Sequence, residues 1–199
     1  AHPLVNQMVP LVRKALPSLS QMEEIEINVS PEEEKEVLIL RLPQLHQGIE
    51  ECLRDLLQIH PALKGIAIRR RKGLTLFGDL NLCFTISLGR PIEHRLLRLR
   101  VSSESFFQVN LKQNERLIQK VLEFSEVKEN ERVLDLYAGT GNLTLPLAIL
   151  SKESWGVEEN QTAVKDARFN AGRNGIKNCE FIHGKVGDIL KRWKRERPD

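Results

Sequence analysis

Apolar and polar residues alternate through the first half of the chain in the manner of short strands. Ile25, Ile27 and Val29 share one side of an extended segment, and residues 37–42 form a second run that Pro43 ends. A polar turn separates these two runs, so we predict a hairpin. Further strands are predicted at residues 66–68, 74–79, 82–88 and 97–101. This half is therefore expected to be α+β with mostly antiparallel strands.

One segment of this half has a helical period instead. Ile49, Cys52, Leu53, Leu56 and Leu57 occupy positions i, i+3, i+4, i+7 and i+8, which form one face of a helix. Cys52 is accordingly interpreted as a small core residue and not as a reactive thiol.

The pattern changes after about residue 110, where a helical period extends to residue 122. Residues 133–137 are a short apolar run, which predicts a parallel strand buried on both faces. Two more strands are predicted at residues 155–158 and 179–182, with helices that start at Leu143 and after the capping residue Asn160. Alternation of strands and helices indicates parallel βαβ units.

The two patterns predict an α/β chain in two parts. Residues 1–104 are expected to form an α+β central domain, inserted before the second part. Residues 105–199 are expected to form the first half of a Rossmann-like domain, because only three of about seven strands of such a sheet are visible. The chain is therefore interpreted as an internal segment of a longer protein.

Composition narrows the class of protein. The chain has 199 residues, 41% of them hydrophobic, and no run approaches the roughly 18–20 apolar residues of a membrane span. The amino-terminal residues do not resemble a secretory signal. The three cysteines, Cys52, Cys83 and Cys179, lack metal-ligand spacing and favour a reducing, cytoplasmic location.

The net charge of +3 is unevenly distributed. Basic clusters lie at residues 69–72 and 191–197 and at Arg95, Arg98 and Arg100. A turn at residues 71–73 would expose the first cluster. Such clusters can bind a nucleic-acid backbone, although solvated surface positions explain them equally well.

Candidate chemistry lies in a glycine turn after the apolar run. Asp135 lies near the end of that run, and Gly139 and Gly141 follow it. Glu158 ends the next predicted strand, 19 residues after Gly139. A carboxylate there can accept both hydroxyl hydrogens of a ribose. The third glycine of a dinucleotide motif is absent, so S-adenosylmethionine fits better than a dinucleotide. Asp135 could then meet its ammonium group, while a plain structural turn is the remaining interpretation.

Two motifs together resemble the RNA uracil-5-methyltransferase family, whose members make 5-methyluridine in 23S rRNA or tRNA. Residues 105–110 read Ser-Phe-Phe-Gln-Val-Asn, and residues 135–142 read Asp-Leu-Tyr-Ala-Gly-Thr-Gly-Asn. The resemblance extends over roughly residues 65–190.

The resemblance implies roles for individual residues. Gln108 matches a glutamine that contacts S-adenosyl-L-methionine, and Tyr137 and Asn142 match positions beside the cofactor in the glycine turn. Glu158 matches the ribose carboxylate. Where the family often has Asp or Asn for the adenine, this chain has Lys185, and Asp188 is the substitute that we consider. Phe106 and Phe107 are interpreted as core residues.

The family reaction uses a cysteine thiolate that adds to C6 of uracil, and a carboxylate that removes the C5 proton. None of the three cysteines fits that nucleophile, so we expect both groups to lie outside this chain. The resemblance also implies an amino-terminal RNA-binding barrel and, in many members, a [4Fe-4S] cluster, both outside this chain.

The sequence therefore predicts an enzyme that methylates C5 of a uridine in RNA, with rRNA favoured over tRNA. Residues 1–199 would supply cofactor binding only and would be inactive alone. Two alternatives stay open: another S-adenosylmethionine-dependent base methyltransferase, and a non-catalytic RNA-binding module on a degenerate methyltransferase fold.

Overall fold

The computed structural model of the chain describes residues 2–15, 22–44, 47–92, 95–108 and 110–195. Val109 of the Ser-Phe-Phe-Gln-Val-Asn motif and residues 196 and 197 of the last basic cluster lie outside this part. The chain divides into two compact units, 1–84 and 85–199. This division falls earlier than the domain boundary expected after residue 104. Among the described helices, none has the length and apolar character needed to cross a membrane.

The first unit is a four-stranded sheet in the order β1-β2-β3-β4. The predicted hairpin is confirmed by β1 (Glu24–Ser30) and β2 (Lys35–Arg41), which pair antiparallel. β3 (Leu63–Arg69) and β4 (Leu74–Gly78) form a second antiparallel pair around the exposed residues 70–73. β2 and β3 are parallel, a pairing that alternation alone did not predict.

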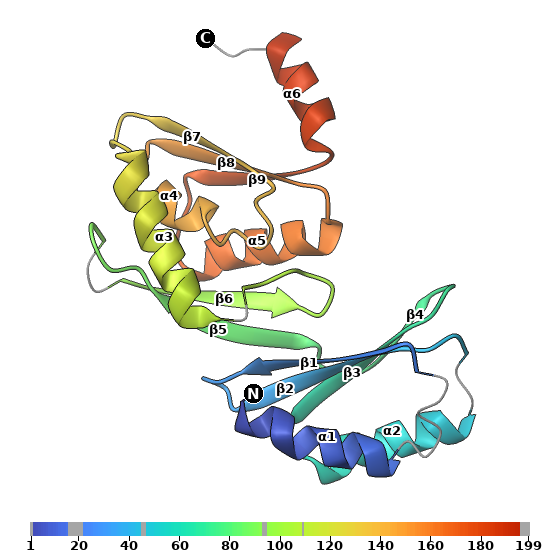
Figure 1. The fold of residues 1–199 in the computed structure, drawn as a ribbon. Helices are drawn as coiled ribbons and strands as arrows, with labels where there is room; N and C mark the ends of the chain where they lie inside the picture. The colour runs from blue at the N-terminus through green and yellow to red at the C-terminus, as the bar shows by residue number, and fades with distance from the viewer. Residues whose placement is uncertain (1, 16–21, 45–46, 93–94, 109, 196–199) are drawn as a thin grey trace. The chain divides into compact units, whose positions relative to one another are not determined.

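Two helices cover one face of this sheet (Figure 1). α2 (Gln47–Ile59) is the predicted helix, and its Leu53 and Leu56 are fully buried while Cys52 is only half-buried. α1 (Pro3–Ala15) was not predicted, because Pro10 lies inside it and interrupts the polar-apolar pattern. Its Met8 and Val12 nevertheless join the core of the first unit.

The second unit contains the strands β7 (Arg132–Leu136), β8 (Glu153–Glu158) and β9 (Cys179–His183), which pair in parallel in that order. α4 (Thr144–Leu150) connects β7 to β8, and α5 (Gln161–Arg173) connects β8 to β9. The predicted βαβ units are therefore confirmed. Asn160 caps α5 as predicted, because its side chain accepts hydrogen bonds from the amides of Thr162 and Ala163.

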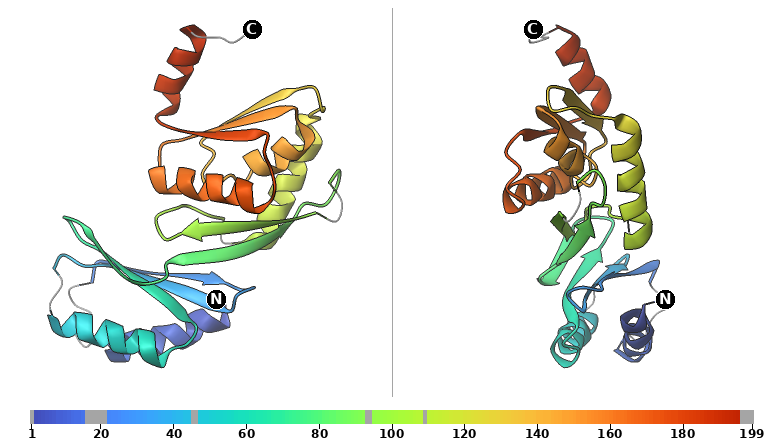
Figure 2. Two further views of the ribbon diagram at one scale, coloured as in Figure 1. Left: turned by 180° about the vertical axis from the view of Figure 1, so that it is seen from behind. Right: turned by 90° about the vertical axis from the view of Figure 1, so that its left-hand side faces the viewer.

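Other elements complete this unit. A two-stranded sheet pairs β5 (Asn81–Ser87) with β6 (Leu96–Ser102), and α3 (Leu111–Ser125) confirms the helical period that starts after residue 110. α6 (Val186–Arg195), which was not predicted, follows β9 and packs against Val157 of β8 on the sheet face opposite α4 and α5 (Figure 2).

The prediction that residues 133–137 are buried on both faces is wrong. Leu134 and Leu136 of β7 are 38% and 37% exposed. α4 packs on one face of this strand. On the other face α6 packs near Val157 of β8 and Ile182 of β9, so the apolar residues of β7 stay accessible there.

Candidate functional site

The glycine turn after β7 lines a cavity of about 190 Å³. One wall is the turn itself, including Asp135, Tyr137, Gly139 and Asn142. The other wall is the segment from Phe106 to Gln108, which precedes α3. The structure thus brings together the two motifs that carried the family resemblance, although about 27 positions separate Gln108 from Asp135 along the chain.

The backbone of the turn is unusual at three positions. Tyr137, Gly139 and Gly141 have φ values of 67°, 55° and 89°, in the left-handed region. Tyr137 is the costly one, because a side chain with a Cβ seldom adopts this conformation and such strain is concentrated at functional sites. At Gly139 a Cβ would meet no atom within 4 Å, so this glycine faces open space beside the cavity.

Glu158 holds the turn from the neighbouring strand. Its Oε2 accepts a hydrogen bond from the amide of Gly139 at 2.9 Å, and its Oε1 accepts one from the amide of Asn160 at 2.7 Å. A carboxylate has about four lone-pair directions, so each oxygen keeps one for a ligand. The half-buried Glu158 is therefore both a structural anchor and an available acceptor.

Asp135 lies at the carboxyl end of β7 on the cavity wall. Burial raises the pKa of its carboxyl, and the nearby negative charge of Glu158 adds to this, although Thr144 donates a hydrogen bond to Oδ2 at 2.6 Å. A cation placed beside this group would relieve the electrostatic cost of its charge.

Asn142 is fixed by a partner that sequence reasoning missed. Its amide group exchanges two hydrogen bonds of 2.8 Å with that of Asn114 on α3. Asn114 is only 2% exposed. The available signal was an asparagine on the apolar face of a predicted helix, since a buried amide requires polar partners.

The two adjacent phenylalanines have different surroundings. Phe107 packs against the core of the second unit, as predicted. Phe106 is 77% exposed and lines the cavity, so its interpretation as a core residue is wrong. Adjacent residues in an extended segment point to opposite sides, and therefore only one of the two rings can face the core. Tyr137 presents a second accessible ring at 74% exposure.

Four predicted site residues do not line the cavity: Gly141, Glu158, Lys185 and Asp188. Glu158 reaches it indirectly, because it accepts a hydrogen bond from the amide of Gly139, which does line it. Lys185 is exposed and approaches Glu159 at 3.9 Å, and Asp188 lies on the exposed first turn of α6. Gln108 does line the cavity and is exposed.

No cysteine lines this cavity. Cys179 begins β9, and burial raises the pKa of its thiol to about 11, which makes it a poor nucleophile near neutral pH. Cys52 lies on α2 and Cys83 on β5, both half-buried. The structure thus supplies no activated thiol at the glycine turn.

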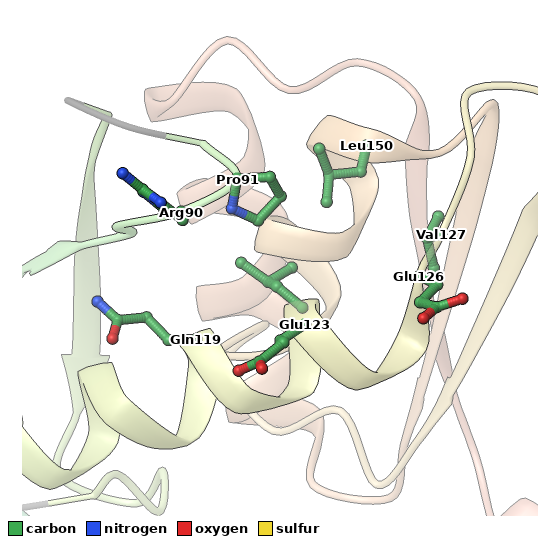
Figure 3. A pocket seen from close by; sticks show the side chains of 8 residues that line it. Arg90, Pro91, Gln119, Glu123, Glu126, Val127 and Leu150 are labelled. Carbon is green, nitrogen blue, oxygen red and sulfur yellow. The ribbon is translucent and has the colours of Figure 1, made fainter.

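The second unit also contains a larger open groove of about 830 Å³, between the loop at Arg90 and Pro91 and the helices α3 and α4 (Figure 3). Apolar side chains form much of its lining, including Leu122, Val127 and Leu150. It shares no lining residue with the cavity at the glycine turn and contains no predicted site residue. The smaller cavity is therefore the candidate site.

The basic clusters differ in how they are used. Arg70, Arg71 and Lys72 are exposed at the end of the β3–β4 hairpin, as predicted. Arg100, in contrast, makes an ion pair with Asp166 at 2.9 Å and stacks over Phe169. Arg70, Arg71 and Lys72 are therefore accessible to an anionic partner, whereas Arg69 of the same cluster pairs with Glu26 and Arg100 belongs to the internal structure of its unit.

A glycine turn after the first parallel strand and a carboxylate at the end of the second are typical of Rossmann-like domains, the class of fold to which the second unit belongs. The profile of the tRNA (uracil-5-)-methyltransferases matches residues 68–198. The chain belongs to the tRNA (uracil-5-)-methyltransferase family. This confirms the family predicted from the two motifs, and with it the predicted fold class.

Individual relatives agree with this assignment. A protein named "Uncharacterized RNA methyltransferase" from Enterococcus faecalis is 35% identical over 77% of this chain, and one from Staphylococcus epidermidis is 32% identical over 83%. The matches cover 34% of each relative, so the chain spans about a third of their length.

A solved structure shows the same fold. The tRNA (uracil-54, C5)-methyltransferase of Pyrococcus abyssi, in complex with S-adenosyl-L-homocysteine, has a TM-score of 0.63 to this chain at 19% identity, over 90% of this chain and 46% of that one. At this level of identity the likeness shows a shared fold; the ligand named for that structure is the demethylated form of the cofactor predicted from the sequence.

Proposed function

We propose that the chain binds S-adenosyl-L-methionine at the glycine turn, and that the intact protein transfers its methyl group to C5 of a uridine in RNA, in rRNA more than in tRNA. The observation that carries this proposal is the Glu158 carboxylate. It lies at the carboxyl end of β8, is anchored by two backbone amides, and keeps acceptor capacity for a ligand.

The nucleoside part of the ligand accounts for Glu158. Two ribose hydroxyl groups can donate to the two carboxylate oxygens, which the amides of Gly139 and Asn160 hold in a fixed orientation. The exposed rings of Phe106 and Tyr137 offer flat apolar surfaces of the kind on which a nucleobase stacks.

The amino-acid part of the ligand accounts for the turn. Gly139 leaves space for close approach of a ligand to the backbone. The carboxyl of Asp135, whose pKa burial raises, gains a counter-charge from an ammonium group. S-adenosyl-L-methionine combines these two parts without a pyrophosphate, and its sulfonium supplies the transferable methyl group.

The assignment of uridine C5 rests on the family and on the motif at residues 105–110. Methylation at C5 needs a thiolate that adds to C6, and the cavity lining has none. We therefore expect this thiol to come from outside residues 1–199. The exposed cations at residues 70–72 are suited to contact the RNA backbone. We expect the protein in the cytoplasm, where this RNA is found.

The reaction is tested with the intact protein, S-adenosyl-L-methionine labelled in its methyl group, and unmodified transcripts of 23S rRNA and of tRNA. Digestion to nucleosides and mass spectrometry should find labelled 5-methyluridine, more in rRNA. Label on a base nitrogen would contradict methylation at C5. It would support the first alternative, another S-adenosylmethionine-dependent base methyltransferase. Binding of S-adenosylhomocysteine with RNA binding but no label on either RNA would favour the non-catalytic module.

A second experiment separates C5 chemistry from other base methylation. RNA that contains 5-fluorouridine traps an enzyme whose thiolate adds to C6, because the fluorine cannot be removed as a proton. We expect a covalent adduct of protein and RNA by mass spectrometry. Methylation of normal RNA without an adduct would contradict the thiolate mechanism.

A further inference from the structure

One face of α5 and its C-cap residue carry three polar side chains at spacings of four residues: Asp166, Asn170 and the C-cap Asn174. All three bond to β6, which lies alongside α5 (Figure 1). They contact the backbone of Arg98, Arg100 and Ser102, which are alternate residues of that strand. Three side chains of a helix thus take the place of a neighbouring strand along β6.

Asp166 is completely buried and has four hydrogen-bond donors around it. Arg100 Nε, the amide and hydroxyl of Ser102, and the hydroxyl of Ser105 lie 2.8 to 2.9 Å from its two oxygens. A buried carboxylate is tolerated only with such partners. The fourth donor matters for the site, since Ser105 directly precedes the Phe106–Gln108 wall of the cavity.

Asn170 is also completely buried. Its Oδ1 accepts a hydrogen bond from the amide of Arg100 at 2.7 Å, and its Nδ2 donates to the carbonyl of Arg100 at 3.0 Å. The same Nδ2 donates to the carbonyl of Thr140 at 3.1 Å. Thr140 lies between Gly139 and Gly141, so Asn170 bonds directly to the glycine turn.

We infer that Asp166 and Asn170 are positioning residues for the cofactor site: adjacent turns of α5 hold its two walls at a fixed separation. Asp166 fixes the wall that follows Ser105, and Asn170 fixes the wall formed by the glycine turn. Neither residue lines the cavity, so both act through the residues that they hold. The inference rests on the proposed binding of S-adenosyl-L-methionine at this turn.

Asn174 provides a matched control within the same row. Its side chain accepts from the amide of Arg98 and donates to the carbonyl of Arg98, each at 2.9 Å, as Asn170 does with Arg100. Its other side-chain contact is the carbonyl of Asn170. Neither Arg98 nor Asn170 lines the cavity, so Asn174 supports β6 without bonding to a wall of the site.

The two serines that donate to Asp166 provide a second pair of test positions, at which a substitution disturbs the structure less than at Asn170. Ser102 and Ser105 each contribute one hydroxyl hydrogen bond of 2.9 Å to the same carboxylate. Ser102 belongs to β6, whereas Ser105 adjoins the cavity wall. Replacement of either by alanine removes one donor and leaves the ion pair of Asp166 with Arg100 in place.

The experiment measures S-adenosylhomocysteine affinity by calorimetry and stability by urea unfolding, in the intact protein and four variants. Asn170→Ala should lose more stability than Asn174→Ala, because Asn170 is completely buried and Asn174 only partly, so affinities are compared under conditions where both variants are folded. Asn170→Ala should weaken binding on the order of tenfold, and Asn174→Ala by less than about twofold. Ser105→Ala should weaken binding more than Ser102→Ala does.

The outcomes separate this inference from the proposed function. If the unsubstituted protein binds S-adenosylhomocysteine and the two variants of each pair bind equally, the positioning role is overturned while the proposed function stands. If the unsubstituted protein shows no binding, the proposed cofactor site itself fails. Should Asn170→Ala not fold, the serine pair alone decides the positioning role.

Discussion

Each of the two compact units contains a helix that joins two parallel strands, but the two connections have different consequences. In the first unit, α2 joins the parallel strands β2 and β3; in the second, α4 joins β7 and β8. The turn after β7 contains two glycines in the left-handed conformation and lines a cavity. Among the residues that the structure describes after β2, there is no such turn. The supersecondary structure alone therefore does not create the site.

The carboxylates of the two units also differ in whether a ligand can reach them. Glu36 lies near the start of β2 and is fully buried, and its Oε1 forms a hydrogen bond of 2.6 Å with Nε2 of His60. Burial raises the pKa of Glu36, and its Oε2 has no hydrogen-bond partner in the described part of the chain. Asp135 and Glu158 instead lie at the carboxyl ends of their strands, Asp135 one residue before the last of β7, and both remain partly accessible. Carboxylates at the carboxyl ends of parallel strands can reach a ligand, whereas Glu36 cannot.

The largest expected effect is on stability, and it belongs to the first unit. His60→Ala should cost about 3 kcal/mol of unfolding free energy at neutral pH, because it leaves the buried Glu36 carboxyl without its imidazole partner. The loss should be smaller at pH 5 than at pH 7, because burial raises the pKa of Glu36 and a lower pH favours its uncharged form. Urea unfolding at both pH values measures this. A loss of unfolding free energy below about 1 kcal/mol would contradict a structural role of the Glu36–His60 pair. A change in S-adenosylhomocysteine affinity would contradict the claim that Glu36 has no part in ligand binding.

A pair of glycines separates backbone strain from ligand access. Gly139 and Gly175 both have φ in the left-handed region, and a Cβ on either would meet no atom within 4 Å. Gly139→Ala and Gly175→Ala should therefore each lose about 1 kcal/mol of stability. Only Gly139 lines the cavity, so only its substitution should weaken S-adenosylhomocysteine binding, measured by calorimetry. Equal affinities of the two variants would remove Gly139 from the site.

The pH dependence of stability tests Asp135. Burial raises its pKa, so the folded protein holds this proton to higher pH than the unfolded chain, whose aspartates titrate near 3.9. The group therefore lowers stability as pH rises from about 4 through the folded pKa. Asp135→Asn removes this loss and keeps an acceptor for Thr144. Compared with the unsubstituted protein, the variant should gain stability between pH 4 and 7 in urea unfolding; an unchanged pH profile would contradict the assignment.

The smallest expected effect concerns Cys179, whose thiol should not react with an alkylating reagent in the folded protein. Since burial raises the pKa of Cys179 to about 11, iodoacetamide should leave this thiol largely unmodified at pH 8. The same cysteine should react readily after denaturation in urea. Peptide mass spectrometry distinguishes the two states. Rapid alkylation of Cys179 in the folded protein would show an activated thiol where the structure has none.

Much of the second unit could be predicted from the sequence because its signals are local. The strands β7 to β9, the cap at Asn160 and the carboxylate Glu158 all follow from short patterns and from spacing along the chain. The polar residues that support the site could not be found in this way. Asp166 contacts Ser102, which is 64 positions away, and no helical period indicates which strand a buried polar residue will meet.

Exposure was predicted less well than secondary structure. Composition indicated burial for Leu134, Leu136 and Phe106, and all three are accessible. Burial depends on what covers each face of an element, and this is a property of tertiary packing that an apolar run does not encode. The helix α1 was not predicted for a related reason. Packing of Met8 and Val12 in the core outweighs the helix-breaking tendency of Pro10, and the sequence does not show this packing.

The central claim, that the carboxylate at the end of β8 holds a nucleoside ligand, is tested most directly by calorimetry with S-adenosylhomocysteine. The intact protein is compared with Glu158→Gln and with Glu159→Gln, an exposed neighbour that lies 3.9 Å from Lys185. The account predicts that Glu158→Gln weakens binding at least about tenfold and that Glu159→Gln changes it by less than about twofold. Unchanged affinity of Glu158→Gln would contradict the account.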